Sequence, residues 1–486
     1  MESNTKNIKI KNPLICIVGS TASGKTKLSL ELAKKYPGLI EIVNADAMQL
    51  YKGADIMTAK ATAEEQQIVK HHLLDILPLE QLDYSRREYC DVAIKTISEL
   101  HAAGKIPLIV GGTNYYIESI LFNDYDISEQ INLEEAEKLH QEIMKNLEDN
   151  NEDEEKKTEE ISREDPIFRD WLHLNPSDKY NLLKRIDPLI AEKLHPNDVK
   201  RVENYIKLYL EENIIPSKKL MAINSMRKLR YESPIVFWIK DKYKKNLMKR
   251  IEKRINEMID INGIKEIVQI YEYLESKGEL NFTKGALQSI GYKEFHDFYK
   301  KCKEFASEKG LSKATELIEL YHSKDDLENP LKDCLEECAK LLNVATQQYS
   351  KRQIRWIKNR LFDNELLKGH VFELEFSDAS KFMEEAVDKG AAILDSYFDG
   401  KIEFKHDSQK QEGTDKERYM AWKKVYCDVC QIYLNGEKEF EAHSNSKRHK
   451  KCKEKKAKLE KNMEMKMKYE LLKQEKEKQE KNEDSG

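Results

Sequence analysis

The sequence lacks the features that would place its 486 residues in a membrane or in an oxidising compartment. It has no run of about 18 apolar residues, the length that a membrane-spanning helix needs. Residues 1–12 have neither the apolar centre of a signal peptide nor the arginine-rich pattern of a transit peptide. The eight cysteines are scattered apart from one pair near the C-terminus, which is typical of a reducing compartment. We therefore expect no membrane partner and a cytoplasmic location, with the nucleus and the mitochondrion as alternatives.

A large excess of charge of one sign is also missing. The net charge is -5 at pH 7, so the overall charge does not indicate a nucleic-acid partner. The charges are unevenly distributed, however, because the segment 148–165 holds ten acids against three bases. Such a run is typical of a solvated loop that repels RNA. The length of the chain is sufficient for two or three domains.

The strongest signal that is present is a glycine-rich stretch that fits G-x-x-x-x-G-K-[ST] at every fixed position. Its residues are Gly19, Ser20, Thr21, Ala22, Ser23, Gly24, Lys25 and Thr26. It follows the apolar run Leu14–Val18 and precedes a helical pattern over Lys27–Lys35, which is the context of a phosphate-binding loop. The loop N–H groups would bind a phosphate-bearing substrate, Lys25 would neutralise its terminal phosphate, and Thr26 would hold Mg²⁺. A glycine-rich turn without a ligand is the alternative.

Apolar runs alternate with helical patterns along the first 120 residues, which predicts a parallel sheet with crossover helices. The runs are Leu14–Val18, Leu39–Val43, His72–Ile76 and Ile106–Val110. A later run, Pro234–Ile239, predicts a strand that rejoins this sheet after an inserted domain. We therefore expect an α/β fold, with a P-loop-type parallel sheet covered by helices on both faces.

Asp46 follows the second of these runs and is a candidate site residue, since open α/β sheets bind their ligands at the ends of strands. Its position alone allows three interpretations: a ligand of Mg²⁺, the N-cap of a helix, or a general base. Gln49, about one turn further on, has a donor and an acceptor that suit the edge of a purine.

Several motifs in a fixed order resemble the tRNA dimethylallyltransferase family. They are the glycine-rich loop, Asp46-x-x-Gln49-x-Tyr51, Thr58-Ala59-Lys60, His71-His72-Leu73-x-Asp75, Gly111-Gly112-Thr113, His195-Pro196-Asn197-Asp198 with Arg201, Ile290-Gly291-Tyr292-Lys293-Glu294, and Thr346-x-x-Tyr349-x-Lys351-Arg352-Gln353-x-x-Trp356. The set covers roughly residues 13 to 360. The resemblance implies transfer of a dimethylallyl group from dimethylallyl diphosphate to N6 of adenosine 37, just 3′ of the anticodon of a tRNA.

The resemblance also implies roles for individual residues. Asp46 would be the base, with the Thr21 hydroxyl beside it. The diphosphate and its Mg²⁺ would be held by the glycine-rich loop and by Arg201. The tRNA anticodon arm would contact Ala47, Met48, Gln49, Thr113, Lys200, Arg201, Lys351 and Arg352. The family usually has a second arginine where this chain has Asn204, and Lys200 is a candidate to compensate.

Three other functions share part of this pattern. An adenylate dimethylallyltransferase, which makes free cytokinin, has the phosphate loop but no use for a tRNA-clamping insertion. A P-loop nucleotide kinase would need an arginine-rich lid, and we find none between the loop and the late strand. A non-catalytic RNA-binding protein would not need Lys25, Thr26 and Asp46, which are all intact.

Near the C-terminus, Cys427-x2-Cys430-x12-His443-x5-His449 has the spacing of a structural two-Cys, two-His zinc site in a ββα finger. The predicted domains are the first part of the catalytic core (1–122), a tRNA-clamping helical insertion (123–195) with the acidic loop 148–165, the second part of the core with C-terminal helices (196–365), a strand/helix extension and linker (366–420), the finger (421–452) and a charged tail (453–486). A single RNA clamp needs no partner subunit, so we expect a monomer.

Two further patterns each allow more than one interpretation. An amphipathic helix around 247–259 carries Lys249, Arg250, Lys253 and Arg254 on its polar face. Such bases usually serve solubility, and only the neighbouring motifs favour contact with diphosphate or RNA. Tyr115 and Tyr116 follow the glycine pair and are either a stacking face or, as is more common at the end of a strand, part of the core.

Overall fold

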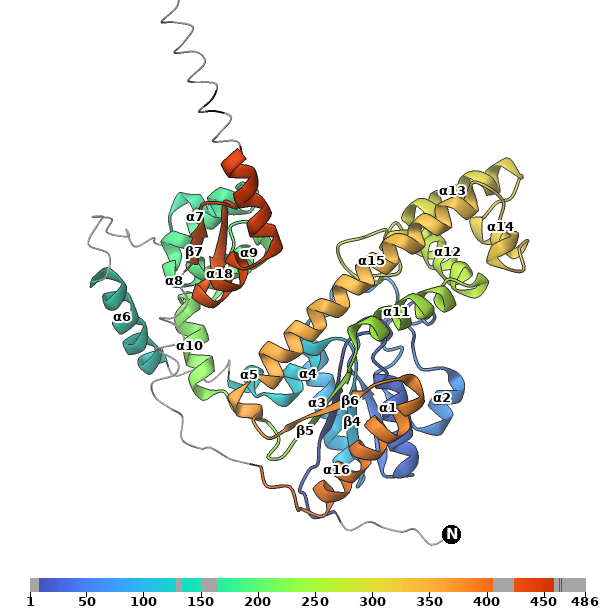
Figure 1. The fold of residues 1–486 in the computed structure, drawn as a ribbon, viewed down its shortest axis with the longest axis horizontal. Coiled ribbons are helices and arrows are strands. Elements are labelled where there is room, and N and C mark those ends of the chain that lie inside the picture. Colours follow the sequence, from blue (N-terminus) through green and yellow to red (C-terminus); the bar gives the residue numbers. More distant parts are fainter. Residues whose placement is uncertain are drawn as a thin grey trace, which may run out of the picture. The chain divides into compact units, whose positions relative to one another are not determined.

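The computed structural model describes residues 8–127, 133–149, 164–404 and 424–458, together with 463 and 465. The chain divides into two compact units (Figure 1). The first comprises Met1–Asp126 and Arg227–His406, and the second comprises Ile127–Met226 and Asp407–Gly486. Most of the predicted acidic loop, of the linker and of the charged tail lies outside the described residues. Within the described part, no helix is both long and apolar enough to cross a membrane.

The first unit is built on one six-stranded sheet in which every neighbouring pair is parallel. Its strands are β1 (Ile15–Val18), β2 (Ile40–Asn44), β3 (His71–His72), β4 (Ile106–Val110), β5 (Ile235–Asp241) and β6 (Val371–Phe376). They lie in the order β3-β2-β4-β1-β5-β6. β1 and β4 are buried at every position, as expected for parallel strands covered on both faces. The predicted parallel sheet is therefore confirmed, and the late strand β5 pairs with β1.

Two strands differ from the sequence prediction. β3 is only two residues long, because Leu73 and Asp75 adopt positive φ angles of 57° and 54°, which an extended strand cannot contain. β6 comes from the segment predicted as an extension, yet it pairs with β5 along its whole length. Its Leu374 and Phe376 are buried against the apolar side chains of the sheet, so this part of the extension belongs to the first unit.

Helices cover both faces of the sheet, as predicted. Side chains alternate along β1, so that Ile15 and Ile17 face one layer and Cys16 and Val18 face the other. One layer contains α1 (Lys25–Lys35) and α16 (Lys389–Phe398). The other contains α3 (Arg86–Ala102), α4 (Asn114–Leu121) and α11 (Lys244–Met258). The same apolar cluster continues into α12 (Ile261–Ser276), α13 (His296–Glu308), α14 (Ala314–Glu319) and the long α15 (Leu331–Ile357), and α13 and α14 lie away from the sheet, packed on α12 and α15 (Figure 1). Two shorter helices are α2 (Ala63–Ile68) and α5 (Asp124–Ile127).

The second unit contains a set of helices, two of which begin at side-chain caps. It comprises α6 (Leu133–Asp149), α7 (Pro176–Ile186), α8 (Pro188–Lys193), α9 (Val199–Glu212) and α10 (Pro216–Met226). The Asn175 side chain accepts a hydrogen bond from the N–H of Asp178, and Asp187 caps α8 in the same way; a proline follows each cap. α9 packs through Val202 and Ile206 in the same apolar cluster as α7, and α10 contacts α6. The helical unit therefore extends to Met226, beyond the boundary at 195 that the sequence indicates.

The finger is a hairpin of β7 (Lys424–Cys427) and β8 (Ile432–Asn435), followed by α18 (Gly436–Ser444) and by helical residues 447–458. The order strand, strand, helix is the ββα arrangement predicted from the cysteine and histidine spacing.

Candidate active site

The glycine-rich loop turns tightly between β1 and α1. Gly24 has φ 93°, a left-handed conformation that favours glycine, and α1 begins at the next residue. A Cβ on Gly19 would lie 2.5 Å from the Ser23 hydroxyl oxygen and 2.7 Å from the Ile239 carbonyl oxygen, so no side chain fits there. The Ser23 hydroxyl is buried and has no hydrogen-bond partner in the described part of the chain. An unused buried donor at the N-terminus of a helix fits a phosphate oxygen.

Lys25 is held over this loop. Its Nζ donates to the carbonyl oxygens of Gly19 at 3.1 Å and Ser20 at 2.9 Å. Burial of the ammonium group, with a smaller effect from the nearby Arg254 guanidinium, lowers the pKa of Lys25 to about 8, and the Asp46 carboxylate opposes this shift. Two cations and one carboxylate therefore lie close enough to interact, which leaves an excess of positive charge for an anionic ligand.

The Asp46 carboxylate is fixed by two backbone N–H groups. Oδ1 accepts from Met48 at 3.1 Å and Oδ2 accepts from Gly112 at 3.2 Å. A Cβ on Gly112 would lie 2.7 Å from Oδ2, which explains the glycine at this position. The bond to Met48, at the first residue of a short 3-10 helix (Met48–Leu50), resembles a cap. Each carboxylate oxygen can accept a further bond, so a capping contact leaves Asp46 able to accept a proton.

Gln353 on α15 connects the loop to the turn after β4. Its Oε1 accepts from the N–H of Thr21 at 2.8 Å, and its Nε2 donates to the Gly112 carbonyl oxygen at 3.0 Å. The Tyr349 hydroxyl donates to the same carbonyl at 3.2 Å. We call Thr21, Lys25, Asp46, Gly112, Gln353 and Arg254 the Asp46 cluster. Gln353 lies in one of the family motifs, but its role could not be predicted from the sequence, because only the fold brings α15 to the loop.

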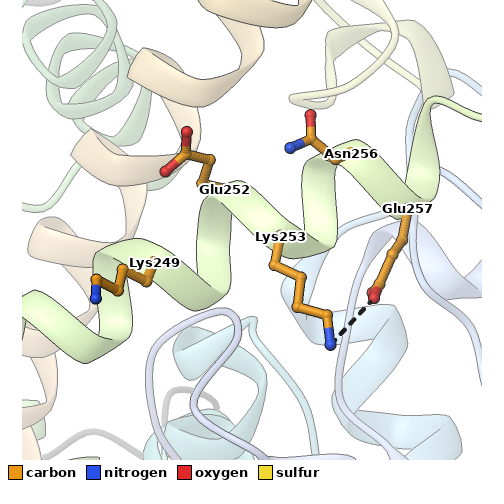
Figure 2. Close-up of a pocket in the computed structure, with 5 residues that line it drawn as sticks. All are labelled: Lys249, Glu252, Lys253, Asn256 and Glu257. Carbon is orange, nitrogen blue, oxygen red and sulfur yellow. Dashed lines mark ion pairs between the residues drawn. The ribbon is translucent and has the colours of Figure 1, made fainter.

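The four bases of α11 divide into two pairs. Arg250 Nε donates to the Ala22 carbonyl oxygen at 3.0 Å and forms an ion pair with Asp241. Arg254 follows one turn later, where burial lowers its pKa and the Asp46 carboxylate raises it. Lys249 and Lys253 instead line an open cavity of about 450 Å³ along the helix (Figure 2). There Lys253 pairs with Glu257 at 3.6 Å. Only the two arginines therefore contribute to the phosphate loop.

The predicted tRNA-binding residues occupy several places. The Thr113 hydroxyl accepts from the N–H of Ala47 at 2.9 Å, so these two residues lie next to the Asp46 cluster with Met48. Gln49 Nε2 donates to the carbonyl oxygens of Thr58 and Ala59 at 3.2 Å each, and its amide oxygen takes no part in these two bonds. The remaining residues are exposed: Lys351 and Arg352 on α15 of the first unit, and Lys200 and Arg201 at the start of α9 of the second.

Glu266, a buried residue on α12, connects the loop before Thr58 with Tyr292, which belong to two of the family motifs. The sequence did not single out this glutamate. Its carboxylate accepts from the N–H groups of Asp55, Ile56 and Met57 at 2.7–3.0 Å and from the Tyr292 hydroxyl at 2.8 Å. Glu266 thereby fixes the loop that carries Thr58 and Ala59, and so the partners of Gln49.

The four predicted zinc ligands converge in the finger. Their ligand atoms all lie within 4.8 Å of one another, and they form the one group of this kind found among the described residues. His443 Nε2 lies 3.3 Å from Cys427 Sγ and 3.1 Å from His449 Nδ1, and Cys430 Sγ lies 3.7 Å from the same Nδ1. Ligands at about 2.0–2.3 Å from a tetrahedral zinc are separated by roughly such distances. The site is therefore a structural zinc site in which all four positions are protein ligands.

The IPP transferase family matches residues 49–360, which is well over half of the chain. The chain belongs to this family. A zinc finger of C2H2 type matches residues 425–449. The tRNA dimethylallyltransferase of Schizosaccharomyces pombe is 29% identical over 90% of this chain and 94% of its own length. The human enzyme is 27% identical over 92% and 87%, and that of Caldanaerobacter subterraneus is 31% identical over 71% and 88%.

A solved structure of a eukaryotic dimethylallyltransferase acting on tRNA has the same fold as this member of the family. The two share 25% identity with a TM-score of 0.64, over 93% of this chain and 99% of the other. The family model covers the quoted motifs from Thr58 to Trp356, and the glycine-rich loop and Asp46 precede its first matched residue.

Proposed function

We propose that this chain transfers a dimethylallyl group from dimethylallyl diphosphate to N6 of adenosine 37 of a tRNA, with release of diphosphate. The observation that carries the proposal is the Asp46 cluster in a chain of this family. A carboxylate with free acceptor capacity lies beside a phosphate loop, Lys25 and Arg254, so that one place can hold a diphosphate and accept a proton.

The reaction forms a carbon–nitrogen bond between N6 and the allylic carbon while the bond from that carbon to the diphosphate oxygen breaks. The loop N–H groups, Lys25 and Arg254 stabilise the negative charge on the departing diphosphate. Asp46 accepts the proton that the amine loses. The Thr21 hydroxyl, the other proposed catalytic group, belongs to the glycine-rich loop. Mg²⁺, held by the Thr26 hydroxyl together with the diphosphate, would supply further charge neutralisation. The target base must leave the anticodon stack to reach this place.

Two other parts of the chain support a tRNA substrate. The second unit would clamp the anticodon arm, with Lys200 and Arg201 contacting the backbone or diphosphate. Arg201 is well exposed, and its Nε donates to Asp198 at 2.7 Å, which orients the guanidinium. The finger carries exposed bases around its histidines, at Lys447, Arg448, Lys450 and Lys451, that suit phosphate contacts. We further propose a reducing compartment such as the cytoplasm, because none of the eight cysteines forms a disulfide and two of them belong to the zinc site. We expect a monomer, since a single RNA clamp needs no partner subunit.

Incubation with labelled dimethylallyl diphosphate and either bulk tRNA or AMP tests this proposal. Label in tRNA, at N6 of adenosine 37 after nuclease digestion, supports it. Label in AMP instead would indicate an adenylate dimethylallyltransferase. Hydrolysis of ATP without transfer would indicate a kinase-like enzyme, and tRNA binding without any reaction would indicate a non-catalytic RNA-binding protein.

The depressed pKa of Lys25 predicts an alkaline limit to activity. Lysine is a cation only when protonated, so with a pKa of about 8 the free enzyme loses this charge as the pH rises through that value. We expect kcat/KM for dimethylallyl diphosphate to fall by up to about tenfold per pH unit above pH 8. In Lys25→Met, kcat/KM should be low at every pH, and the decrease above pH 8 should be absent. A decrease with the same midpoint in this variant would mean that another group titrates.

Loss of zinc should affect tRNA binding more than turnover. A finger of this size depends on its metal to fold, so Cys427→Ala should abolish zinc binding and raise the Kd for tRNA, with kcat at saturating tRNA nearly unchanged. Zinc content and Kd are the measurements. Cys338→Ala is the matched control, because Cys338 is buried on α15, outside the zinc site. Unchanged tRNA affinity in the zinc-free variant would make the finger a module for stability or for protein contacts.

A further inference from the structure

An exposed aromatic side chain lies beside the Asp46 cluster. Tyr115 follows Thr113 by two residues, in the first turn of α4, and is 52% exposed. Its ring meets the ring of Trp356, three residues after Gln353 on α15, with centroids 5.2 Å apart and an interplanar angle of 72°. The neighbouring Tyr116 is buried and stacks on Tyr89 at 3.7 Å, so it belongs to the core. Of the tyrosine pair, only Tyr115 offers a ring face to a ligand.

Arginine side chains surround this ring. The Arg86 guanidinium lies 5.8 Å from the centroid of Tyr115 and 5.1 Å from that of Tyr125, within the range of a cation–π interaction. Arg360 follows Trp356 by four residues along the chain, and half of its side chain is exposed. An arginine next to an exposed aromatic ring is a common arrangement for binding single-stranded nucleic acid.

A buried carboxylate fixes these arginines in place. Glu118 on α4 accepts from Arg360 Nη2 at 2.7 Å and from Arg227 Nη2 at 2.9 Å, and its other oxygen lies 3.7 Å from Arg86 Nη1. Arg227 also pairs with Asp124 at 2.8 Å. Three arginines against two carboxylates leave one net positive charge, and its most exposed carriers are Arg360 and Arg86. The group is therefore both ordered and cationic.

We propose that Tyr115 and Trp356 form a stacking platform for a nucleobase that neighbours the reactive adenosine, with Arg86 and Arg360 at its phosphates. The inference rests on the proposed function. When adenosine 37 leaves the stack, each neighbouring base loses a stacking partner, and this loss opposes base flipping. A ring two residues from Thr113, which itself bonds to Ala47 beside Asp46, is well placed to replace that partner. The platform would thus select the flipped state of the RNA without touching the reacting atoms.

Substitution of Tyr115 separates this role from a structural one. Tyr115→Leu should raise the Kd for a tRNA anticodon stem-loop, and the KM for tRNA, by about 5-fold to 100-fold, the range measured for loss of one base–aromatic stack. The KM for dimethylallyl diphosphate should not change, and Tyr115→Phe should restore binding. Tyr243→Leu is the matched control, since Tyr243 is 53% exposed elsewhere in the first unit and has Lys242 over its ring.

A stem-loop with an abasic nucleotide on one side or the other of adenosine 37 gives a second, independent readout. For the wild-type chain, one of the two abasic RNAs should bind more weakly than the intact RNA, and in Tyr115→Leu this difference should disappear. Equal binding of the intact RNA by wild type and Tyr115→Leu, or an abasic penalty that persists in the variant, would overturn the platform. Failure of the wild-type chain to prenylate tRNA would instead contradict the proposed function, so the two outcomes are distinguishable.

Discussion

Replacement of Asp46 by alanine is expected to lower kcat by ~10²–10⁴ and to leave tRNA affinity nearly intact. Among the described residues, two backbone N–H groups donate to the carboxylate, and each of its oxygens can accept a further bond, so it retains the capacity to take the proton from N6. The measurement is single-turnover transfer at saturating tRNA and dimethylallyl diphosphate, with tRNA Kd determined in parallel. This variant should produce the largest effect on turnover of any single substitution in the cluster.

Asp46→Asn distinguishes a role of Asp46 as a general base from a role as a structural cap. The asparagine oxygen can still accept one of the two backbone hydrogen bonds, but the amide cannot accept a proton at neutral pH. We therefore expect Asn to be nearly as inactive as Ala. Near-normal turnover of Asp46→Asn, or a parallel loss of tRNA binding and turnover in Asp46→Ala, would mean that Asp46 serves as a structural cap.

Arg254→Gln is expected to lower kcat/KM for dimethylallyl diphosphate by about 10²–10³, because it removes a partly buried cation from the place where charge develops on the departing diphosphate. Burial lowers the pKa of this guanidinium and the Asp46 carboxylate opposes the shift, as expected for a cation within reach of that carboxylate. The effect should be smaller in tRNA binding than in the diphosphate step. Steady-state kinetics with each substrate varied in turn provide this comparison.

Lys253→Gln is the matched control for Arg254→Gln. It removes a positive charge one residue away on the same helix, but its side chain is 78% exposed and lines the cavity along α11 (Figure 2). We expect its kinetics to match wild type within about twofold, as is usual for a surface charge. Equal decreases of kcat/KM in both variants would mean that the effect comes from net charge. Unchanged kcat/KM in Arg254→Gln would mean that Arg254 does not belong to the diphosphate site.

The parts of the site that the sequence predicts are those in which neighbouring residues carry the chemistry. The phosphate loop and the zinc ligands depend on residue types at fixed local spacing, and both are found at the expected positions. The four bases of α11 show the limit of this approach. Their shared polar face does not reveal which of them approach the loop, because the rotation of α11 against the sheet decides it, and only Arg250 and Arg254 do.

Contacts between distant segments could not be predicted either. Gln353 joins the loop across 332 positions, and Glu266 supports the loop at Ile56 across 210. A glutamine or glutamate on an amphipathic helix carries no local sign of such a role. The same holds for the fold boundary at Met226, which follows from the packing of Val202 and Ile206 against α7, and for β3, which is shortened by backbone angles at Leu73 and Asp75.

The most direct test of the account is a structure of this chain with an anticodon stem-loop and an unreactive thio analogue of dimethylallyl diphosphate. The account predicts an unstacked adenine whose N6 lies within about 3 Å of an Asp46 carboxylate oxygen, with the allylic carbon on the other side of N6 and its diphosphate on Lys25 and Arg254. A carboxylate turned away from the amine, or an adenine that remains in the anticodon stack while the diphosphate is bound, would contradict it.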